Sequence, residues 1–140
     1  MMRTLYIILF LFCFTGCSDD DTESILPNVP VDVTINLNLP QYLDLQTPTG
    51  WAYSTGGIKG IIIQNQGVGT PPYKAFDRAC PNNDCTGAMN FDGSLKLTCP
   101  CDNSTYSIID GSPQTPNGRY FAKEYKVTLI NASTLNITNF

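Results

Sequence analysis

The sequence of 140 residues contains no histidine. A catalytic triad of the Ser–His–Asp kind is therefore excluded, because its general base is missing. The chain also lacks a phosphate-binding glycine loop and a dinucleotide fingerprint. It has 8 basic and 12 acidic residues, a net charge of −4, and so carries no basic patch for nucleic acid. We predict no enzymatic activity and no binding to nucleic acid.

The N-terminal apolar run is too short to cross a membrane. It covers Leu5 to Phe14, whereas a membrane-spanning helix needs about 20 residues. Arg3 precedes the run and Gly16-Cys17 ends it, an order typical of a secretory signal. The small residues before Cys17 resemble the lipobox of bacterial lipoproteins, which implies cleavage before Cys17 and lipid on its sulfur. We predict a signal peptide at residues 1–16 and membrane attachment through Cys17.

An acidic segment, Ser18-Asp19-Asp20-Asp21-Thr22-Glu23, follows the predicted lipid site. Like charges repel one another and keep such a segment extended, so residues 17–30 are predicted to be a tether. The segment also resembles the signal that sends lipoproteins to the cell surface in some Gram-negative lineages. We expect an envelope protein that is lipid-anchored to the outer membrane, towards the cell surface.

The remaining residues, 31–140, are predicted to form one all-β domain. Apolar and polar residues alternate from Val31 to Leu39, which is the period of a strand with one buried face. Glycine and proline interrupt the chain at short intervals, and no window shows a helical period. A β-sandwich or barrel without helices fits this pattern. The predicted strands are 31–39, 51–55, 58–64, 73–77, 95–98, 105–109, 120–130 and 135–137.

Four of the six cysteines lie in two short loops. The first loop reads Cys80-Pro81-Asn82-Asn83-Asp84-Cys85, and the second reads Cys99-Pro100-Cys101-Asp102-Asn103-Ser104. The envelope is an oxidising compartment, so these cysteines are expected to pair unless a metal holds them.

The two loops resemble the cluster-binding loops of Rieske iron–sulfur domains. In that family two cysteines hold one iron of a [2Fe–2S] cluster and two histidines hold the other. Cys80 and Cys99 stand at the cysteine-ligand positions. Cys85 and Cys101 stand where the bc-complex type has a disulfide between the loops, and Ser104 stands where a serine hydrogen-bonds the cluster. The resemblance implies a Rieske-like antiparallel fold with both cysteine loops at one tip.

The chain departs from the family pattern at both histidines. Asn82 and Asp102 occupy those positions. An asparagine amide is a poor iron ligand, and an aspartate is a hard anion of different length and charge. We therefore expect the cluster to be lost. The alternative is an electron-transfer protein with an unorthodox [2Fe–2S] cluster, held by Cys80 and Cys99 with Asp102.

Three arrangements of the four cysteines remain open. All four could hold one cluster or a zinc ion, although their spacing is not a standard zinc pattern. The pair Cys85–Cys101 could form a disulfide and leave Cys80 and Cys99 as free thiols for thiol–disulfide exchange. In the third arrangement Cys80 also pairs with Cys99, because the family's ligand cysteines share one iron and lie side by side. We favour the third.

These observations predict a structural role, or binding of an unknown envelope partner through the tip. Asp77 and Arg78, just before the first cysteine loop, are interpreted as an ion pair or a solvated edge rather than as catalytic groups.

Overall fold

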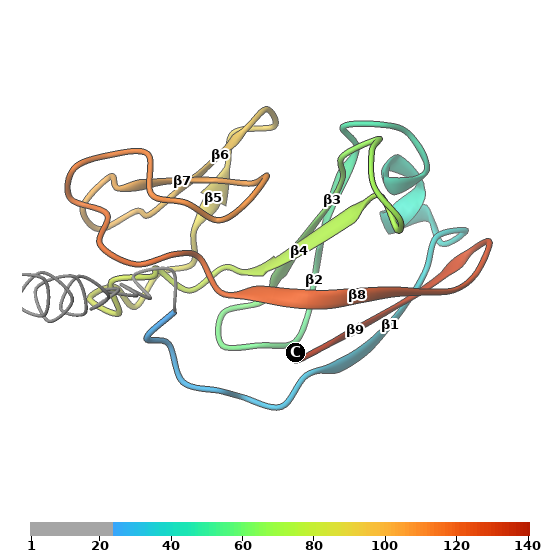
Figure 1. The fold of residues 1–140 in the computed structure, drawn as a ribbon, viewed down its shortest axis with the longest axis horizontal. Helices are drawn as coiled ribbons and strands as arrows, with labels where there is room; N and C mark the ends of the chain where they lie inside the picture. The colour runs from blue at the N-terminus through green and yellow to red at the C-terminus, as the bar shows by residue number, and fades with distance from the viewer. Residues whose placement is uncertain (1–23) are drawn as a thin grey trace, which may run out of the picture.

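The computed structural model describes residues 24–140, which form nine β-strands and one short 3₁₀ helix (Figure 1). The predicted signal peptide and Cys17 lie outside these residues. The elements are β1 (Asp32–Asn36), η1 (Pro40–Gln46), β2 (Trp51–Ser54), β3 (Ile61–Asn65), β4 (Tyr73–Asp77), β5 (Asn90–Phe91), β6 (Lys96–Thr98), β7 (Thr105–Ser107), β8 (Glu124–Asn131) and β9 (Thr134–Thr138). Within the described part, no helix has the length and apolar character needed to span a membrane.

Six strands form one antiparallel sheet in the order β1-β9-β8-β4-β3-β2. The first strand of the described chain therefore pairs with the last, and Asp32 lies opposite Thr138. The strand β4 contacts β8 in the ladder only at Ala75 and Phe76, after which β8 continues with β9 (Figure 1).

Strand β3 lies inside the large sheet and is buried on both faces, as its unbroken apolar run predicts. Ile61 and Ile63 point to one side, into a core that Leu45 of η1 and residues of β1 and β9 complete. Ile62 points to the other side, into a second core shared with the smaller sheet. The alternation of side chains along one strand thus joins the two halves of the domain.

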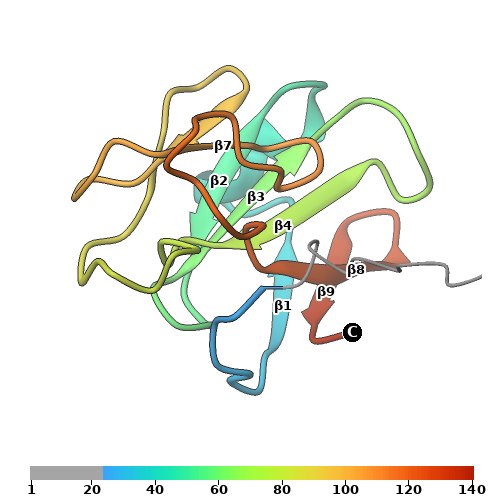
Figure 2. The ribbon, with the colours of Figure 1, turned by 60° about the vertical axis from the view of Figure 1, so that its left-hand side comes forward.

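The smaller sheet contains three very short strands in the order β5-β6-β7. Its side chains Leu97 and Tyr106 are fully buried against Phe76 of the large sheet. Two loops that follow β4 and β6 carry the four cysteines, and they lie on the same side of the molecule (Figure 2). An all-β antiparallel fold with both cysteine loops at one tip is therefore confirmed.

Local differences from the predicted elements have simple causes. The strand expected over 31–39 ends at Asn36, and Leu39 is exposed. The segment Pro40–Gln46 forms a 3₁₀ helix where no helix was predicted. Proline starts this helix, and Leu45 is its one buried side chain. A segment of seven residues with one buried side chain shows no helical period in the sequence. The two-residue strand β5 was also missed, because two residues give no periodic pattern.

The interpretation of Asp77 as part of an ion pair or a solvated edge is wrong. Asp77 is fully buried, and its carboxylate accepts hydrogen bonds from the backbone of Ile58 (2.6 Å), Lys59 (3.2 Å) and Ala79 (2.7 Å) and from the hydroxyl of Tyr125 (2.7 Å). Four donors satisfy the buried anion. Burial raises the pKa of Tyr125, and its hydrogen bond to Asp77 and the negative charge of Asp77 raise it further.

The side chain of Arg78 contacts residues on other strands just before the first cysteine loop begins. Its guanidinium lies 3.7 Å from the centre of the Tyr53 ring, and its Nε donates to the carbonyl of Met89 at 2.9 Å. The pair Asp77 and Arg78 therefore fixes the chain between β4 and the tip from two sides.

Candidate functional site at the cysteine loops

Two loops, residues 80–87 and 99–104, meet at one end of the smaller sheet. We call them the first and the second cysteine loop, and together with residues 113–119 they form the tip. Asn83 and Asn103 adopt left-handed backbone angles, with φ of 56° and 58°, a conformation that asparagine tolerates better than most residues. Gly87 allows the close approach of the loops, because a Cβ there would lie 2.8 Å from Pro100 Cγ.

Two disulfides join the loops side by side. Cys80 pairs with Cys99 and Cys85 pairs with Cys101, with Cα atoms 5.6 Å and 5.7 Å apart. The two disulfides differ in burial: Cys80 and Cys99 are 1% and 0% exposed, Cys85 is half-buried, and Cys101 is exposed. We call them the inner and the outer disulfide. The prediction of disulfide bonds at the tip is confirmed.

Asn82, at the first histidine position, connects three segments of the tip. Its Oδ1 accepts from the backbone of Arg119 at 3.0 Å and from the hydroxyl of Tyr106 at 3.4 Å. Its Nδ2 donates to the carbonyl of Asn117 at 2.9 Å. Both ends of the amide are thereby engaged in holding loops together.

Asp102, at the second histidine position, is engaged within its own loop. Its Oδ1 accepts from the backbone N–H of Ser104 at 2.9 Å and from the Ser104 hydroxyl at 2.7 Å. These two hydrogen bonds stabilise the carboxylate and lower the pKa of Asp102. Ser104, which the resemblance assigns to a cluster, is 1% exposed and donates to Asp102 instead.

Sequence reasoning did not single out Asn117, which links the two histidine positions. Its carbonyl accepts from Asn82, and its Nδ2 donates to the backbone carbonyl of Asp102 at 3.0 Å. The sequence Pro116-Asn117-Gly118 is a turn signal, and this is the one feature that could have drawn attention to it.

The residues at the tip do not fit a Rieske cluster. Such a cluster needs two nitrogen ligands on its second iron, and the chain has no histidine. Asn82 and Asp102 direct their oxygens to Arg119 and Ser104 rather than to a shared point. The positions that would complete the iron's coordination are therefore used by the protein itself.

Three sulfur atoms nevertheless lie close together. The Sγ atoms of Cys80, Cys85 and Cys99 are all within 4.8 Å of one another. Asp102, which the alternative ligand set included, lies outside this group among the described residues. The third ligand-type atom beside the inner disulfide is therefore the sulfur of Cys85.

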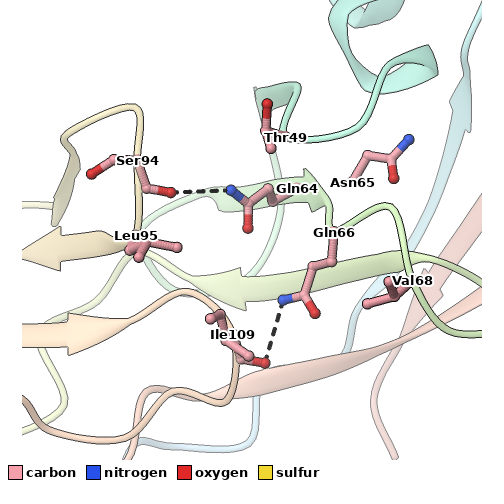
Figure 3. A pocket seen from close by; sticks show the side chains of 8 residues that line it. All are labelled: Thr49, Gln64, Asn65, Gln66, Val68, Ser94, Leu95 and Ile109. Carbon is pink, nitrogen blue, oxygen red and sulfur yellow. Dashed lines mark hydrogen bonds between the residues drawn. The ribbon is translucent and has the colours of Figure 1, made fainter.

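A recess lies at the opposite end of the smaller sheet, where the turn before β6 approaches the large sheet (Figure 3). The side-chain amide of Gln64 donates to the carbonyl of Ser94 at 3.4 Å, and that of Gln66 donates to the carbonyl of Ile109 at 3.3 Å (Figure 3). The recess has a volume of about 170 Å³. It is lined by Thr49, Gln64, Asn65, Gln66, Val68, Ser94, Leu95 and Ile109.

None of the eight lining side chains titrates, so the recess offers no general acid or base. Val68, Leu95 and Ile109 are 73%, 56% and 51% exposed at its rim. Sequence reasoning missed this feature, because the three apolar residues come from separate segments of the chain.

No family model matches the chain, and no curated protein matches its sequence. Solved structures that are similar in shape include the following two. The ferredoxin of carbazole 1,9a-dioxygenase from Nocardioides aromaticivorans has 15% identity and a TM-score of 0.49, over 81% of this chain and 100% of the other. A protein from Mycobacterium tuberculosis, designated the small subunit of an NADH-dependent nitrite reductase, has 12% identity and a TM-score of 0.48, over 81% and 98%.

Proposed function

We propose that this protein is an envelope lipoprotein whose Rieske-like domain has lost its cluster and serves as a disulfide-held structural or partner-binding module. One observation carries the proposal. The side chains at both histidine positions, Asn82 and Asp102, are engaged in hydrogen bonds that hold the tip together. In the same tip the cysteines at the ligand positions are bonded to each other.

The inner disulfide holds Cys80 and Cys99 close together, as a shared iron would. It holds Cys80 and Cys99, which are 19 positions apart, at a Cα separation of 5.6 Å. A closed loop of this length restricts the unfolded chain by about 3 kcal/mol on the chain-entropy estimate. The loops can therefore keep one shape without a metal.

A rigid tip suits recognition of another protein. Loops that are already ordered lose little conformational entropy on binding, and this lowers the cost of association. Two disulfides and the hydrogen bonds of Asn82 and Asn117 supply that order here. The proposed partner is an envelope protein that contacts the exposed surface around Cys101.

Metal content tests the proposal. The wild-type protein, purified anaerobically from its native envelope, is assayed for iron, acid-labile sulfide, free thiols and visible absorbance. The matched control is Cys80→Ser/Cys99→Ser, which removes both cysteine-ligand positions. We expect neither protein to contain iron and the wild type to have no free thiol among its four tip cysteines. About two irons per wild-type chain, lost in the control, would overturn the proposal and establish an electron-transfer protein.

The membrane attachment is tested separately, because Cys17 lies outside the described residues. We expect wild-type protein in the outer-membrane fraction and accessible to protease on intact cells. Cys17→Ala removes the sulfur that would carry the lipid, so we expect an unlipidated precursor with residues 1–16 still attached. A Cys17→Ala variant that is still cleaved before residue 17 and still reaches the outer membrane would contradict a lipid anchor.

A further inference from the structure

The inner and outer disulfides are adjacent but differ in access to solvent. The Sγ of Cys85 lies within 4.8 Å of both sulfurs of the inner disulfide. Cys80 and Cys99 are buried, so a thiol on another protein cannot reach them directly. The outer disulfide ends at Cys101, which is exposed. Thiol–disulfide exchange requires access of the attacking thiolate to a sulfur, and only the outer disulfide offers it.

Cys85 belongs to the outer disulfide and is also the nearest neighbour of the inner one. An attack on the exposed Cys101 would make Cys85 the leaving group. The released thiolate would lie within 4.8 Å of the sulfurs of both Cys80 and Cys99. The Sγ of Cys101 is not in this group of three sulfurs.

We propose that the tip is a thiol–disulfide relay, in which the outer disulfide receives a partner's thiol and Cys85 passes the exchange to the inner disulfide. The partner is a protein with two reduced cysteines, able to close into a disulfide of its own. This activity goes beyond the structural role proposed above, and it places the exchange at Cys101 rather than at Cys80 and Cys99.

A partner thiolate attacks Cys101 Sγ, a mixed disulfide forms, and the Cys85–Cys101 bond breaks with its electron pair leaving on Cys85. The Cys85 thiolate attacks Cys80 or Cys99, and the other inner cysteine leaves as a thiolate that takes a proton from water. The partner's second thiolate attacks the mixed disulfide and releases Cys101. The partner dithiol is oxidised to a disulfide, and the protein keeps one disulfide and two thiols.

Two single variants test the relay against each other. Cys101→Ser leaves Cys85 free beside the inner disulfide, and Cys85→Ser leaves Cys101 free at the surface. Both proteins lose the same outer disulfide. Each is held at neutral pH, quenched in acid, alkylated and mapped by mass spectrometry for its disulfide pairs, after circular dichroism has shown it to be folded.

We expect Cys101→Ser to show Cys80–Cys85 or Cys85–Cys99 pairs beside Cys80–Cys99. Cys85→Ser should keep Cys80–Cys99 with at least about tenfold fewer rearranged pairs, since exchange follows the access of the thiolate. If both variants contain Cys80–Cys99 as their one disulfide and no rearranged pairs, the relay is overturned.

A measurement on the wild type keeps the test valid if a variant does not fold. One equivalent of a reduced dithiol protein of the thioredoxin type is added, and the thiols that appear are trapped and mapped. The relay places label on Cys101 in every product and divides the second label among Cys85, Cys80 and Cys99. A second label confined to Cys85 would show that the outer disulfide is reduced alone, which overturns the relay. Iron content tests the metal-free proposal independently of either result.

Discussion

The large and the small sheet are stabilised in different ways. The large sheet has ladders of four or five residue pairs between most neighbouring strands and a core of fully buried isoleucine and leucine side chains. The small sheet has ladders of two and three pairs, and two disulfides close the loops at its end. Short strands cannot hold loops of this length by backbone pairing alone. Covalent bonds and side-chain hydrogen bonds replace strand pairing where the chain is mostly loop.

This comparison predicts that the largest loss of stability comes from the tip. We expect Cys80→Ala/Cys99→Ala to lower the free energy of unfolding by about 4 kcal/mol, because loop closure and buried sulfur contacts are both lost. The exposed pair, replaced as Cys85→Ala/Cys101→Ala, should cost less, since little burial is lost there. Denaturant unfolding of both variants measures the difference. A smaller loss for the inner pair than for the outer pair would show that burial does not decide which disulfide stabilises the domain more.

Within the large sheet the buried carboxylate should matter next. Asp77→Asn removes the negative charge that accepts four hydrogen bonds. The NH₂ group of the asparagine would also face N–H or O–H donors, with which it cannot form a hydrogen bond. We expect a loss of about 3 kcal/mol, measured in the same unfolding experiment. Asp44→Asn, at an exposed position, serves as the control and should change stability by less than about 0.5 kcal/mol.

The hydrogen bonds across the tip should have an intermediate effect. Asn82→Ala removes links to Asn117, Arg119 and Tyr106 and should cost about 2 kcal/mol. Asn83→Ala, its neighbour, removes no such side-chain link but alters a residue with positive φ. We expect the Asn82 variant to increase hydrogen exchange at residues 115–119, whereas the Asn83 variant leaves that segment protected.

High pH should weaken the large sheet. The pKa of Tyr125 is raised above its ordinary value of about 10, so the folded state keeps the proton that the unfolded state loses. The stabilisation is fully present below pH 10 and is lost as pH rises above it, with a slope of up to about 1.4 kcal/mol per pH unit. Tyr125→Phe should reduce this slope, and the raised pKa values of Tyr73 and Tyr106 should leave a smaller one. An unchanged slope in that variant would assign the effect to another group.

The rim of the recess should show the smallest effect. Leu95→Ser changes a side chain that is 56% exposed, so we expect a change in unfolding free energy within about 0.5 kcal/mol. Leu97→Ser, two residues further along and fully buried, is the matched control and should cost several times more.

The sequence is informative where the physical signal is local. The alternation around Ile35 and the apolar run around Ile62 predict strands, and the structure contains them. The cysteine loops and their pairing follow from a family resemblance at Cys80 and Cys99. By contrast, the burial of Asp77 depends on donors at Ile58 and Tyr125, from other parts of the chain. No local pattern contains that information, and the same holds for Asn117.

We expect the pairing of β1 with β9 to form later than the tip. The disulfides of the tip join cysteines only 19 and 16 positions apart. The backbone of Val31, by contrast, donates to Asn139, 108 positions along the chain. Contacts this distant form late, because the intervening chain must first be ordered. We therefore expect β1 to join the sheet only after β9 has formed. A chain truncated before β9 would leave β1 without a neighbouring strand.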